Sequence, residues 1–291
     1  ETKTILITAG NSLVGKDLIN FLLINNYKVI SIVRKLKDLK NRKNLKIIKH
    51  DFKTKLKLTN KIDLIINTIA THEFSKNKNF YDHYLSNIKC VQNIADLSIQ
   101  KKNAPIINLS TISVYKKNNH IINENNSISK STYLASSKYV GEKILEISGV
   151  RYINLRLPGI LTFNSGSINR PWLRKMIHSI ISNEPIHIFN KNSKFNSIID
   201  TIELFKFIEF FLKRKKKTTG TFNLASSNPL KLGSIINEII KFYNSSSVTK
   251  WSRKIENSSS TISIKKIQNE LGYKPSTLKH ILKRYLKKIV I

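Results

Sequence analysis

A turn of small residues near the start of the chain is the first stretch whose residue types could do chemistry. The apolar residues 4–8 precede Ala9 and Gly10, and a run with the apolar spacing of a helix follows Gly15. A strand that ends in such a turn before a helix is where parallel α/β sheets hold the phosphates of a dinucleotide. Three spaced glycines are usual there, whereas this chain has Ala9 and Ser12 at two of the small-residue positions. The turn indicates a phosphate site, and an ordinary strand-to-helix turn is the alternative interpretation.

A basic residue follows the next apolar run. Residues 27–33 are predicted to form a second strand, and Arg34 comes directly after it. In dinucleotide-binding folds an acidic side chain at this position accepts a hydrogen bond from a ribose 2′-hydroxyl, and a basic one accommodates a 2′-phosphate. Arg34 therefore favours NADP over NAD as the cofactor. The alternative is that Arg34 is one more surface cation in a chain rich in them.

Short apolar runs alternate with amphipathic stretches through the first half of the chain, and these are the elements that must position such a site. Nearly continuous apolar runs are typical of parallel strands that are buried on both faces. The stretches at 80–100 and 133–148 carry the apolar stripe of helices. This alternation predicts an α/β fold, a Rossmann-type doubly wound parallel sheet. The predicted strands are residues 4–8, 27–33, 45–49, 62–66, 105–109 and 151–156.

After Pro158 the elements become shorter and less regular. We predict helices at 172–182, 202–212 and 232–243, short strands at 185–189 and 221–224, and a basic amphipathic helix at the C-terminal end. Such a pattern fits a smaller lobe built onto the sheet. The predicted domains are a dinucleotide-binding Rossmann core, residues 1–160, and mainly a substrate-binding lobe, residues 161–291, with about 196–225 returning to the core.

The formal net charge of +33 in 291 residues favours a partner such as nucleic acid, an anionic membrane or a phosphorylated substrate. The basic residues are nearly all Lys and are scattered among Asn and Ile, so a solvated surface is favoured over a nucleic-acid groove. No apolar run approaches the ~20 residues that span a bilayer, so no membrane insertion is expected. The chain enters a strand almost at once, without the pattern of a secretion signal. The single cysteine, Cys90, excludes an internal disulfide and favours a reducing, cytoplasmic setting.

A series of short motifs occurs in one order along nearly the whole chain. In sequence they are TAGNSLVG, HDF, NTIAT, SNIKCVQNI, STISVY, SSKYVGE, LRLPGIL, FNSIIDTIEL, GTFNLAS and LGYKP. In this order they resemble the extended short-chain dehydrogenase/reductase family, in its NAD(P)-dependent nucleotide-sugar epimerase and dehydratase branch. The resemblance implies a Rossmann core, an NAD(P) cofactor and hydride transfer to or from a nucleotide-activated sugar.

The resemblance also implies contacts with the cofactor. Asp51 and Phe52 would meet the adenine, Ala70 would line the nicotinamide ribose, and Asn87 would be a structural or cofactor-contacting side chain. The segment from Pro158 to Ile160 would flank the nicotinamide. The residues that would wrap the pyrophosphate are Gly10, Asn11, Ser12, Leu13, Val14 and Gly15.

A catalytic group follows from the same resemblance. Thr111 falls where the family has the Ser or Thr that hydrogen-bonds the reacting oxygen, and Lys138 falls on the family lysine. A Tyr phenol, whose pKa is ~10, exchanges a proton near neutral pH when a neighbouring cation stabilises the phenolate. Tyr and Lys share one face of a helix when they are four residues apart. Here Leu134 stands four residues before Lys138, and Tyr133 stands five residues before it.

Three interpretations of Tyr133 remain open. Five steps place it well over 100° around a helix from Lys138, against roughly 40° for four steps. In the first interpretation, an irregular helix start or a bulge lets Tyr133 reach the substrate. In the second, Leu134 fills the position and the chain is a catalytically degenerate dinucleotide-binding sensor or regulator. In the third, Tyr133 has no role. We favour the first, because Thr111 and Lys138 remain in place.

The substrate contacts depart from the family pattern as well. An Arg often stands near the start of the motif FNSIIDTIEL to bind the substrate diphosphate, and this chain has Asn196 there. Arg170 could supply the charge, although for any one such cation a surface position is the favoured interpretation. Trp172 could stack on the nucleotide base or pack in the core of the lobe. Further cations close in sequence are Arg174, Lys191 and Lys194.

The prediction from sequence is an NAD(P)-dependent oxidoreductase or epimerase that transfers a hydride on a nucleotide-activated sugar. The resemblance implies a homodimer that associates through the helices at 80–100 and 133–148. Ile112 disfavours dehydration, because dehydratases usually have an acidic residue directly after the position of Thr111. The seven His show no metal-ligand spacing, so no metal is expected. The alternatives are the sensor described above and a nucleic-acid-binding member of the fold.

Overall fold

The computed structural model describes residues 2–36, 40–71, 79–116, 121–129, 131–164, 170–252 and 260–289. The chain divides into two compact units. Unit 1 comprises Glu1–Lys117, Glu124–Leu157 and Leu204–Asn223, and unit 2 comprises Asn118–Asn123, Pro158–Glu203 and Leu224–Ile291. The division after Leu157 compares with the predicted boundary at 160, and the segment Leu204–Asn223 returns to unit 1.

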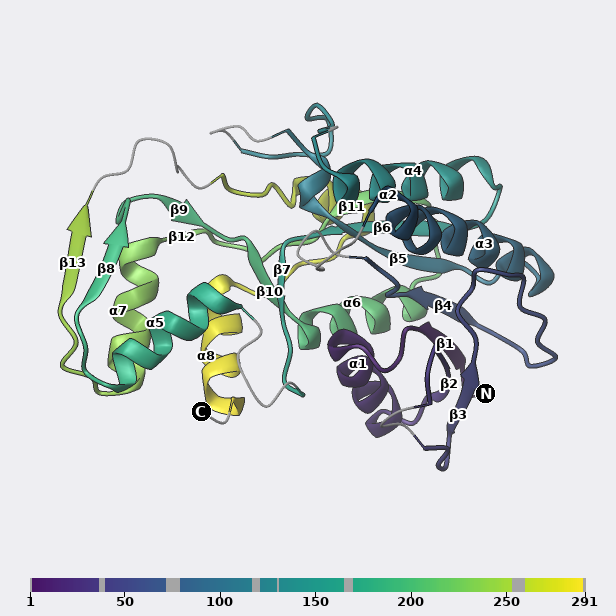
Figure 1. Cartoon of the computed structure of the whole chain (residues 1–291), viewed down its shortest axis with the longest axis horizontal. Helices are drawn as coiled ribbons and strands as arrows, with labels where there is room; N and C mark the ends of the chain where they lie inside the picture. The colour runs from purple at the N-terminus through teal and green to yellow at the C-terminus, as the bar shows by residue number, and fades with distance from the viewer. Residues whose placement is uncertain are drawn as a thin grey trace. The chain divides into compact units, whose positions relative to one another are not determined.

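Unit 1 is built on a seven-stranded parallel sheet in the order β11-β6-β5-β4-β1-β2-β3 (Figure 1). The strand order reverses between β1 and β4, as in a doubly wound fold, and this confirms the predicted fold class. The strands are β1 (Thr4–Thr8), β2 (Lys28–Val33), β3 (Leu45–Lys49), β4 (Leu64–Asn67), β5 (Ile106–Thr111), β6 (Tyr152–Leu157) and β11 (Gly220–Asn223).

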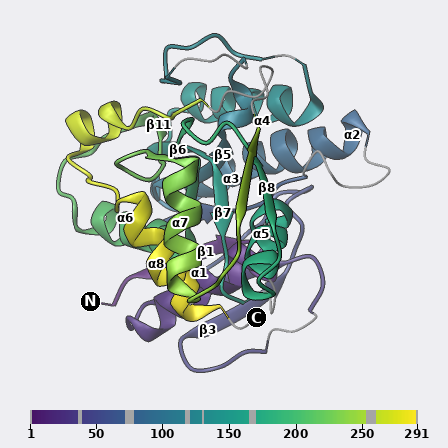
Figure 2. The same ribbon diagram turned by 90° about the vertical axis from the view of Figure 1, so that its left-hand side faces the viewer.

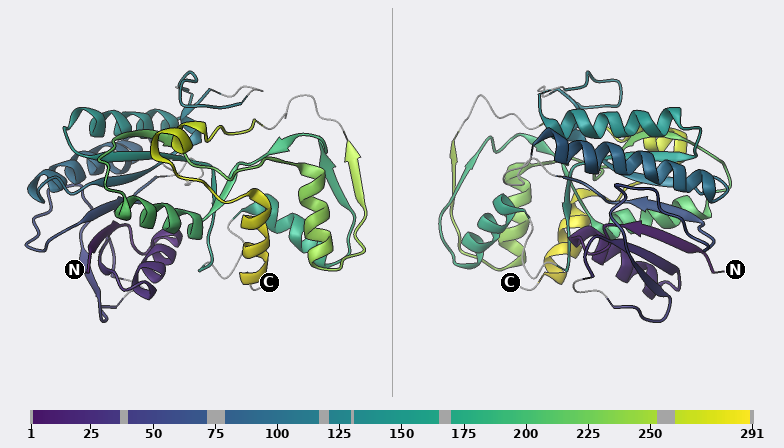
Figure 3. Two further views of the ribbon diagram at one scale, coloured as in Figure 1. Left: turned by 180° about the vertical axis from the view of Figure 1, so that it is seen from behind. Right: turned by 45° about the vertical axis from the view of Figure 1, so that its right-hand side comes forward.

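Helices cover both faces of this sheet, which is why its central strands are buried along nearly their whole length. The helices α1 (Leu13–Ile24) and α6 (Thr201–Lys213) lie on one face, and α3 (Cys90–Gln100) and α4 (Tyr133–Ile147) lie on the other (Figure 3). A short 3₁₀ turn, η2 (Ile112–Val114), follows β5. These layers place the carboxyl ends of β1, β2 and β4 beside the first turn of α1.

The predicted helix at 80–100 is three segments in succession. A short helix α2 (Phe80–His83) leads into a π-helical stretch η1 (Tyr84–Lys89), and α3 follows. The wider π-helical turn brings the backbone of Asn87 close to α4. A Cβ added to Gly141 in α4 would lie 2.4 Å from the carbonyl oxygen of Asn87, so only glycine permits this approach.

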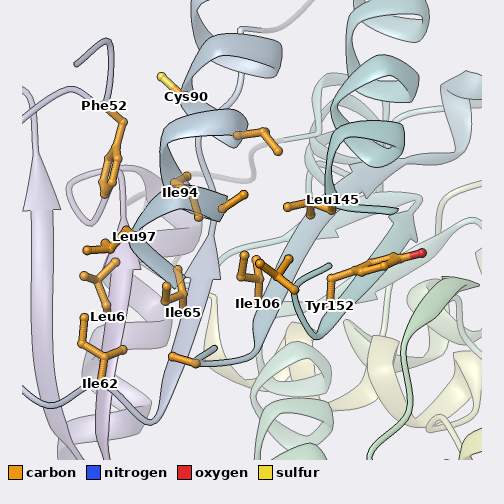
Figure 4. Packing of buried hydrophobic residues seen from close by; sticks show 14 of the residues in the cluster. Leu6, Phe52, Ile62, Ile65, Cys90, Ile94, Leu97, Ile106, Leu145 and Tyr152 are labelled. Atoms are coloured by element: carbon orange, nitrogen blue, oxygen red, sulfur yellow. The ribbon is translucent and has the colours of Figure 1, made fainter. Parts of the chain in front are cut away.

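The hydrophobic core of unit 1 on the α3 and α4 side joins β strands to helix faces (Figure 4). Leu6 and Ile65 project from β1 and β4, and Ile94 and Leu97 project from α3 to meet them. All four side chains are fully buried. Burial of each stabilises the fold by about 1.5–3 kcal/mol relative to exposure.

Unit 2 gathers three amphipathic helices around its own apolar core (Figure 2). The helices are α5 (Pro171–Ile181), α7 (Leu232–Phe242) and α8 (Leu278–Lys288), and a π-helical turn η3 (Ile267–Leu271) precedes α8. No helix in the described ranges has the length and apolar character that crossing a membrane requires. The strands are β7 (Gly159–Leu161), β8 (Ile186–Phe189), β9 (Lys194–Phe195), β10 (Ile198–Asp200), β12 (Leu230–Lys231) and β13 (Thr249–Ser252).

Candidate functional site

The turn between β1 and α1 presents two unpaired backbone N–H groups. Ser12 caps α1, because its Oγ accepts a hydrogen bond from Gly15 N at 3.0 Å. Its own N–H donates to Ala9 O at 2.9 Å. The N–H groups of Leu13 and Val14, in the first turn of α1, have no partner among the described residues. With the positive end of the helix dipole, these groups form a site for an anion such as the pyrophosphate of a dinucleotide.

The two glycines of this turn are required by packing. A Cβ on Gly10 would lie 2.0 Å from Ser31 Oγ in β2, and a Cβ on Gly15 would lie 2.6 Å from Ala9 O. The turn is therefore held tightly between α1 and β2. Ala9 has a φ of 47°, in the left-handed region that favours glycine. The incomplete glycine pattern thus places strain at Ala9.

A cavity of about 480 Å³ opens beside this turn, at the carboxyl ends of the strands around the switch in strand order. The predicted cofactor-binding residues that line it are Asn11, Ser12, Arg34, Asp51 and Ala70. Sequence reasoning did not name the other polar residues of the wall. The rule that ligands bind where parallel strands end would have found those that follow β3 and β4. They include His50, Lys53, Thr68 and Thr71, and Asp82, Ser86 and Cys90 come from the helical segment.

Two cations stand at the cavity without partners. Arg34 follows β2 and Lys53 follows β3, and both side chains are exposed. Neither forms a hydrogen bond or an ion pair with another described residue. The carboxylate of Asp51 accepts a hydrogen bond from the backbone N–H of Lys53 at 3.0 Å. The guanidinium and the ammonium are therefore free to meet a ligand anion.

Phe52 does not lie with the other predicted adenine contacts. Its side chain is fully buried and packs in the core cluster with Leu6 and Ile94 (Figure 4). A φ of 58° turns the chain at this point, and Asn93 Nδ2 holds the carbonyl of Phe52 at 2.7 Å. The expected adenine contact therefore does not hold for the Phe52 side chain, because the reversed backbone directs it into the core.

Asn87 is buried and braces the cavity wall. Its Oδ1 accepts from Thr71 N at 3.3 Å, and its Nδ2 donates to Thr71 O at 3.4 Å. The same amide donates to Ser137 Oγ of α4 at 2.9 Å. Thr71 lines the cavity. Of the two roles predicted for Asn87, the contacts support the structural one.

Lys138 is buried behind the same wall. Its Nζ donates to Ile69 O at 3.1 Å and to Leu109 O at 3.0 Å. Burial lowers the pKa of Lys138 to about 8, and the Glu142 carboxylate opposes that shift. The ammonium thus joins the loop after β4 to β5, and it does not line the cavity.

Thr111 and Tyr133 lie apart from the cavity wall. Thr111 ends β5, and its Oγ1 accepts from Ser113 N at 3.1 Å. The helix α4 is regular from Tyr133 onward, so the bulge that would bring Tyr133 over Lys138 is absent. Leu134 occupies the position four residues before Lys138 and is buried.

The outer face of α4 accounts for the Tyr133 side chain. Tyr133, Val140 and Ile147 recur at seven-residue spacing and are 55%, 42% and 83% exposed. They form one stripe, roughly 140° from the face of Lys138. The Tyr133 ring packs against Phe80, with ring centroids 5.6 Å apart. The geometry therefore places Tyr133 on the surface of the helix layer.

A buried ion pair beneath Thr111 escaped sequence reasoning. Glu142 lies on α4 one turn after Lys138, and its carboxylate accepts from Arg156 Nη2 at 2.7 Å. Ser110 Oγ donates to the same carboxylate. The Arg156 guanidinium also lies over the Tyr115 ring, 4.8 Å from its centroid. The motif residues around Thr111 are thus held by charge in the interior, where breaking such a pair is costly.

Unit 2 contains the predicted substrate residues, and both ends of the Asn196 amide form hydrogen bonds inside the protein. Its Nδ2 donates to Ser226 O and to Ile262 O, both at 2.9 Å, and its Oδ1 accepts from Ile262 N at 2.8 Å. The buried amide therefore joins two distant backbone segments. In these contacts Asn196 has a structural role, and its expected contact with the substrate stays a prediction.

Arg170 keeps the character of an anion ligand. Its guanidinium lies over Gly159, where an added Cβ would be 3.0 Å from Nε. The Nε atom is buried and has no hydrogen-bond partner among the described residues. Burial lowers the pKa of Arg170, because the charged form is partly desolvated. A buried, unsatisfied guanidinium nitrogen is costly unless a ligand completes it.

Trp172 lines a second cavity, of about 500 Å³, within unit 2. Its ring is partly exposed and meets Phe195 edge to face, with centroids 5.9 Å apart. The predicted nicotinamide neighbours Pro158 and Ile160 also belong to unit 2. Ile160 is half-buried in β7, which pairs with β10. The walls of the second cavity are mainly apolar, which suits a planar ring.

Solved structures share this fold along nearly the whole chain. The Bordetella bronchiseptica enzyme WbmG in complex with NAD is 16% identical, with a TM-score of 0.78, covering 99% of this chain and 94% of that one. UDP-glucuronic acid 4-epimerase from Bacillus cereus in complex with NAD is 20% identical, with a TM-score of 0.77 and 98% of each chain covered. UDP-N-acetylglucosamine 4-epimerase from Bacillus cereus is 19% identical, with a TM-score of 0.75, covering 98% of this chain and 95% of that one. At these identities the likeness establishes the fold.

The sequence itself carries the family assignment. A search of curated proteins finds no match. The family profile described as the NAD dependent epimerase/dehydratase family matches residues 5–225, from β1 to just beyond β11. The match spans the dinucleotide turn and the strand ends around the first cavity, and it confirms the resemblance inferred from the motifs. The chain therefore belongs to the NAD dependent epimerase/dehydratase family of enzymes.

Proposed function

We propose that this enzyme binds a nicotinamide dinucleotide in the unit 1 cavity and transfers a hydride on a nucleotide-activated sugar, in an epimerisation or a reduction. The observation that carries the proposal is the free N–H pair of Leu13 and Val14 beside a cavity of about 480 Å³. The solved relatives named as UDP-sugar 4-epimerases support this substrate class. Ile112 after Thr111 makes dehydration the least supported of the family reactions.

The residues present fit the cofactor as follows. Leu13 and Val14 would hold the pyrophosphate, and Ala70 would contact a ribose at the cavity wall. When bound, the cofactor would supply the hydride acceptor or donor for a carbon of the sugar. Thr111 would hydrogen-bond the reacting oxygen once its Oγ1 releases Ser113. Lys138 would hold the wall through Ile69 O, a role that its present contacts already fulfil.

Binding and hydride transfer are both directly measurable. A dinucleotide at 100 times its dissociation constant should stabilise the protein by about 2.7 kcal/mol in thermal unfolding. Addition of a UDP-sugar to the loaded enzyme should then change the absorbance of reduced nicotinamide, which rises when the cofactor accepts a hydride and falls when it donates one. Absence of stabilisation by either NAD or NADP would overturn the proposal. Stabilisation without any absorbance change over a panel of nucleotide-sugars would support a sensor instead.

Proton exchange by Tyr133 remains a proposal that two variants decide. Tyr133→Phe removes the phenol and should lower kcat at least tenfold if the first turn of α4 rearranges to bring it to the substrate. Leu134→Tyr restores a phenol four residues before Lys138, and it should raise kcat if that position faces the substrate. Unchanged kcat in Tyr133→Phe would contradict a catalytic role and leave Tyr133 as part of the outer stripe of α4.

We propose NADP as the preferred cofactor, because Arg34 and Lys53 are unpaired cations at the cavity. A 2′-phosphate bonded to Arg34 should contribute about 1.5–3 kcal/mol, so Arg34→Gln should weaken NADP binding roughly tenfold or more and leave NAD binding unchanged. Lys35→Gln is the matched control, since Lys35 has the same charge next in sequence and does not line the cavity. Calorimetry with 2′,5′-ADP and with AMP isolates the contribution of the 2′-phosphate, because these two probes differ by that group alone. Equal affinities for these two probes would contradict the preference.

The nucleotide of the substrate is proposed to bind unit 2 through Arg170 and Trp172. UDP is the probe, and Arg170→Gln should weaken its binding roughly tenfold, because a charged hydrogen bond is lost. Arg174→Gln, an exposed cation on the same helix, is the control and should change affinity less than about twofold. UDP should quench the fluorescence of Trp172, and Trp172→Phe should abolish that change. Quenching that persists in Trp172→Phe would assign the base elsewhere.

We also propose that the protein is a homodimer and that it works in a reducing, cytoplasmic setting. The exposed stripe of Tyr133, Val140 and Ile147 on α4 supplies an apolar surface for a second copy. Val140→Glu should convert a dimer to a monomer in sedimentation, whereas Glu146→Lys, at an exposed polar position about 100° around the helix from Ile147, should not. Cys90 is free and buried, as suits a compartment without disulfides. A wild-type monomer at micromolar concentration would overturn the dimer proposal.

A further inference from the structure

Three asparagine amides form a row across the interior of the central sheet. Asn67 in β4 is in register with Asn108 in β5, and Asn108 is in register with Asn154 in β6. Each side chain is at most 2% exposed. Asn67 Nδ2 donates to Asn108 Oδ1 at 2.8 Å, and Asn108 Nδ2 donates to Asn154 Oδ1 at 2.9 Å. We call these residues the amide row.

Hydroxyl groups continue the row at both ends. On one side, Thr8 Oγ1 of β1 donates to Asn67 Oδ1 at 2.8 Å. On the other, Asn154 Nδ2 donates to Thr221 Oγ1 of β11 at 3.2 Å. The hydrogen bonds therefore run through five adjacent strands, β1, β4, β5, β6 and β11. Buried amides are costly without partners, and here each one is satisfied by the next.

The Thr8 end of the row is hydrogen-bonded to the loop that lines the cofactor cavity. Thr68 N donates to Thr8 Oγ1 at 2.9 Å, and Ile69 N donates to Asn67 Oδ1 at 3.2 Å. Thr68 Oγ1 also donates to Thr8 O. Thr68, Ile69, Ala70 and Thr71 all line the cavity. Two backbone N–H groups of the wall are thus fixed by side chains in the sheet beneath it.

The opposite side of the same loop is held by the helix layer. Lys138 Nζ bonds Ile69 O, and Asn87 bonds both backbone groups of Thr71. Because side chains alternate between the two faces of a strand, a one-residue slip of β4 or β5 would turn an amide away and break the row. The position of the loop Thr68–Thr71 therefore depends on the register of the strands beneath it.

We propose that Thr8, through the amide row, is a positioning residue that holds the segment Thr68–Thr71 in the geometry that binds the dinucleotide. The inference rests on the proposed cofactor site. It assigns a role to residues that line up in the core and make no contact with the ligand. Loss of the Thr8 hydroxyl frees the N–H of Thr68 while the β1 strand itself is unchanged.

The test compares two matched threonines in the same row. Thr8→Val keeps the side-chain shape and removes the hydroxyl, and it should weaken dinucleotide binding by about fivefold, the loss of one net hydrogen bond. Thr8→Ser keeps the hydroxyl and should retain the wild-type affinity. Thr221→Val makes the same change at the far end of the row, away from the loop, and should alter the affinity less than about twofold.

Hydrogen exchange of the wild-type enzyme gives a readout that needs no variant to fold. The amides of Thr68 and Ile69 should be as protected as those of the sheet, although the segment lines a cavity. Exchange at the rate of a free loop would overturn the inference, as would equal dinucleotide affinity in wild type and Thr8→Val. A wild-type enzyme that binds no dinucleotide would instead refute the proposed function, and protected amides would then still report the hold of the row on the loop.

Discussion

The packing of the dinucleotide turn can be tested by placing a methyl group on Gly10. The added Cβ would lie 2.0 Å from Ser31 Oγ, 2.9 Å from Ile19 Cδ1 and 3.2 Å from Ser31 Cβ. The backbone of Gly10 is outside the left-handed region, so alanine carries no conformational penalty there. The destabilisation therefore comes from steric overlap, which the lower entropy of the unfolded alanine chain offsets by about 0.4–1 kcal/mol. We expect Gly10→Ala to lower the free energy of unfolding by about 2–3 kcal/mol.

Ser31 supplies the means of separating that overlap from other effects. Its Oγ is fully buried and has no hydrogen-bond partner within the described parts of the chain, so Ser31→Ala should change the free energy of unfolding by less than about 1 kcal/mol, or raise it. In the double variant the closest contact is gone, and what remains is the flexible end of Ile19 and the Ser31 Cβ. The cost of Gly10→Ala should then fall to about 1 kcal/mol, a coupling of about 1–2 kcal/mol.

Chemical denaturation with a linear extrapolation measures all four proteins of this cycle. Gly149→Ala is the complementary control, because Gly149 has a φ of 69° and open space around it. Its cost, about 1 kcal/mol, reports backbone conformation without overlap. Additive effects of Gly10→Ala and Ser31→Ala, with no coupling, would refute the steric account of the turn. A Gly10→Ala protein as stable as wild type would refute it as well.

Three further perturbations follow from the interior contacts. The pKa of Lys138 is about 8 in the folded protein and ~10.4 in the unfolded protein, so the unfolded state binds more protons between these pH values and stability should rise with pH there. Relative to Lys138→Met, the wild type should gain about 2–3 kcal/mol of unfolding free energy between pH 8 and pH 10.4, measured by denaturation at each pH. A difference that stays constant with pH would contradict burial of the ammonium. Glu142→Gln leaves the Arg156 guanidinium buried without its charged partner and should lower the free energy of unfolding by about 3–5 kcal/mol, whereas replacing both residues by Met should recover most of that loss. Equal instability of the single and the double variant would contradict a stabilising ion pair. Ala9→Gly removes an alanine from the left-handed region, so it should tighten dinucleotide binding in calorimetry or raise stability in thermal unfolding by up to about 1 kcal/mol. A variant with both weaker binding and lower stability would contradict strain at the turn.

Local patterns predicted the framework of this protein. Strands buried on both faces leave continuous apolar runs, and the runs at 4–8, 45–49 and 151–156 correspond to β1, β3 and β6 within a residue or so. The parallel sheet follows from the alternation of strands and helices, because each crossover through a helix joins parallel strands, whereas the strand order and its switch point came from the structure. The turn around Gly10 was identifiable for the same reason, since its spacing is set by the strand and helix that flank it.

Side-chain partners that are distant in sequence were beyond such patterns. Asn196 is held by Ile262, 66 residues away, and Lys138 by Ile69, 69 residues away. No periodicity reports which backbone group a buried amide or ammonium meets. The direction of the Phe52 side chain depends on a single φ of 58°, which reverses the chain after Asp51, and no sequence pattern reports that reversal. The π-helical stretch η1 was missed because its apolar stripe is that of an ordinary helix.

The sequence by itself determined the doubly wound fold, the strand–turn–helix at Gly10 and the family, because these depend on short spacings that one strand or helix imposes. The tertiary structure alone decided which polar residues face the cavity and which serve the core. Arg34 and Asp51 face the cavity because strands β2 and β3 end beside it. Lys138, Asn87 and the amide row are interior, because a regular α4 and a parallel register bring their partners to them from other strands. That division follows from burial, which requires every polar group to find a partner wherever the fold provides one.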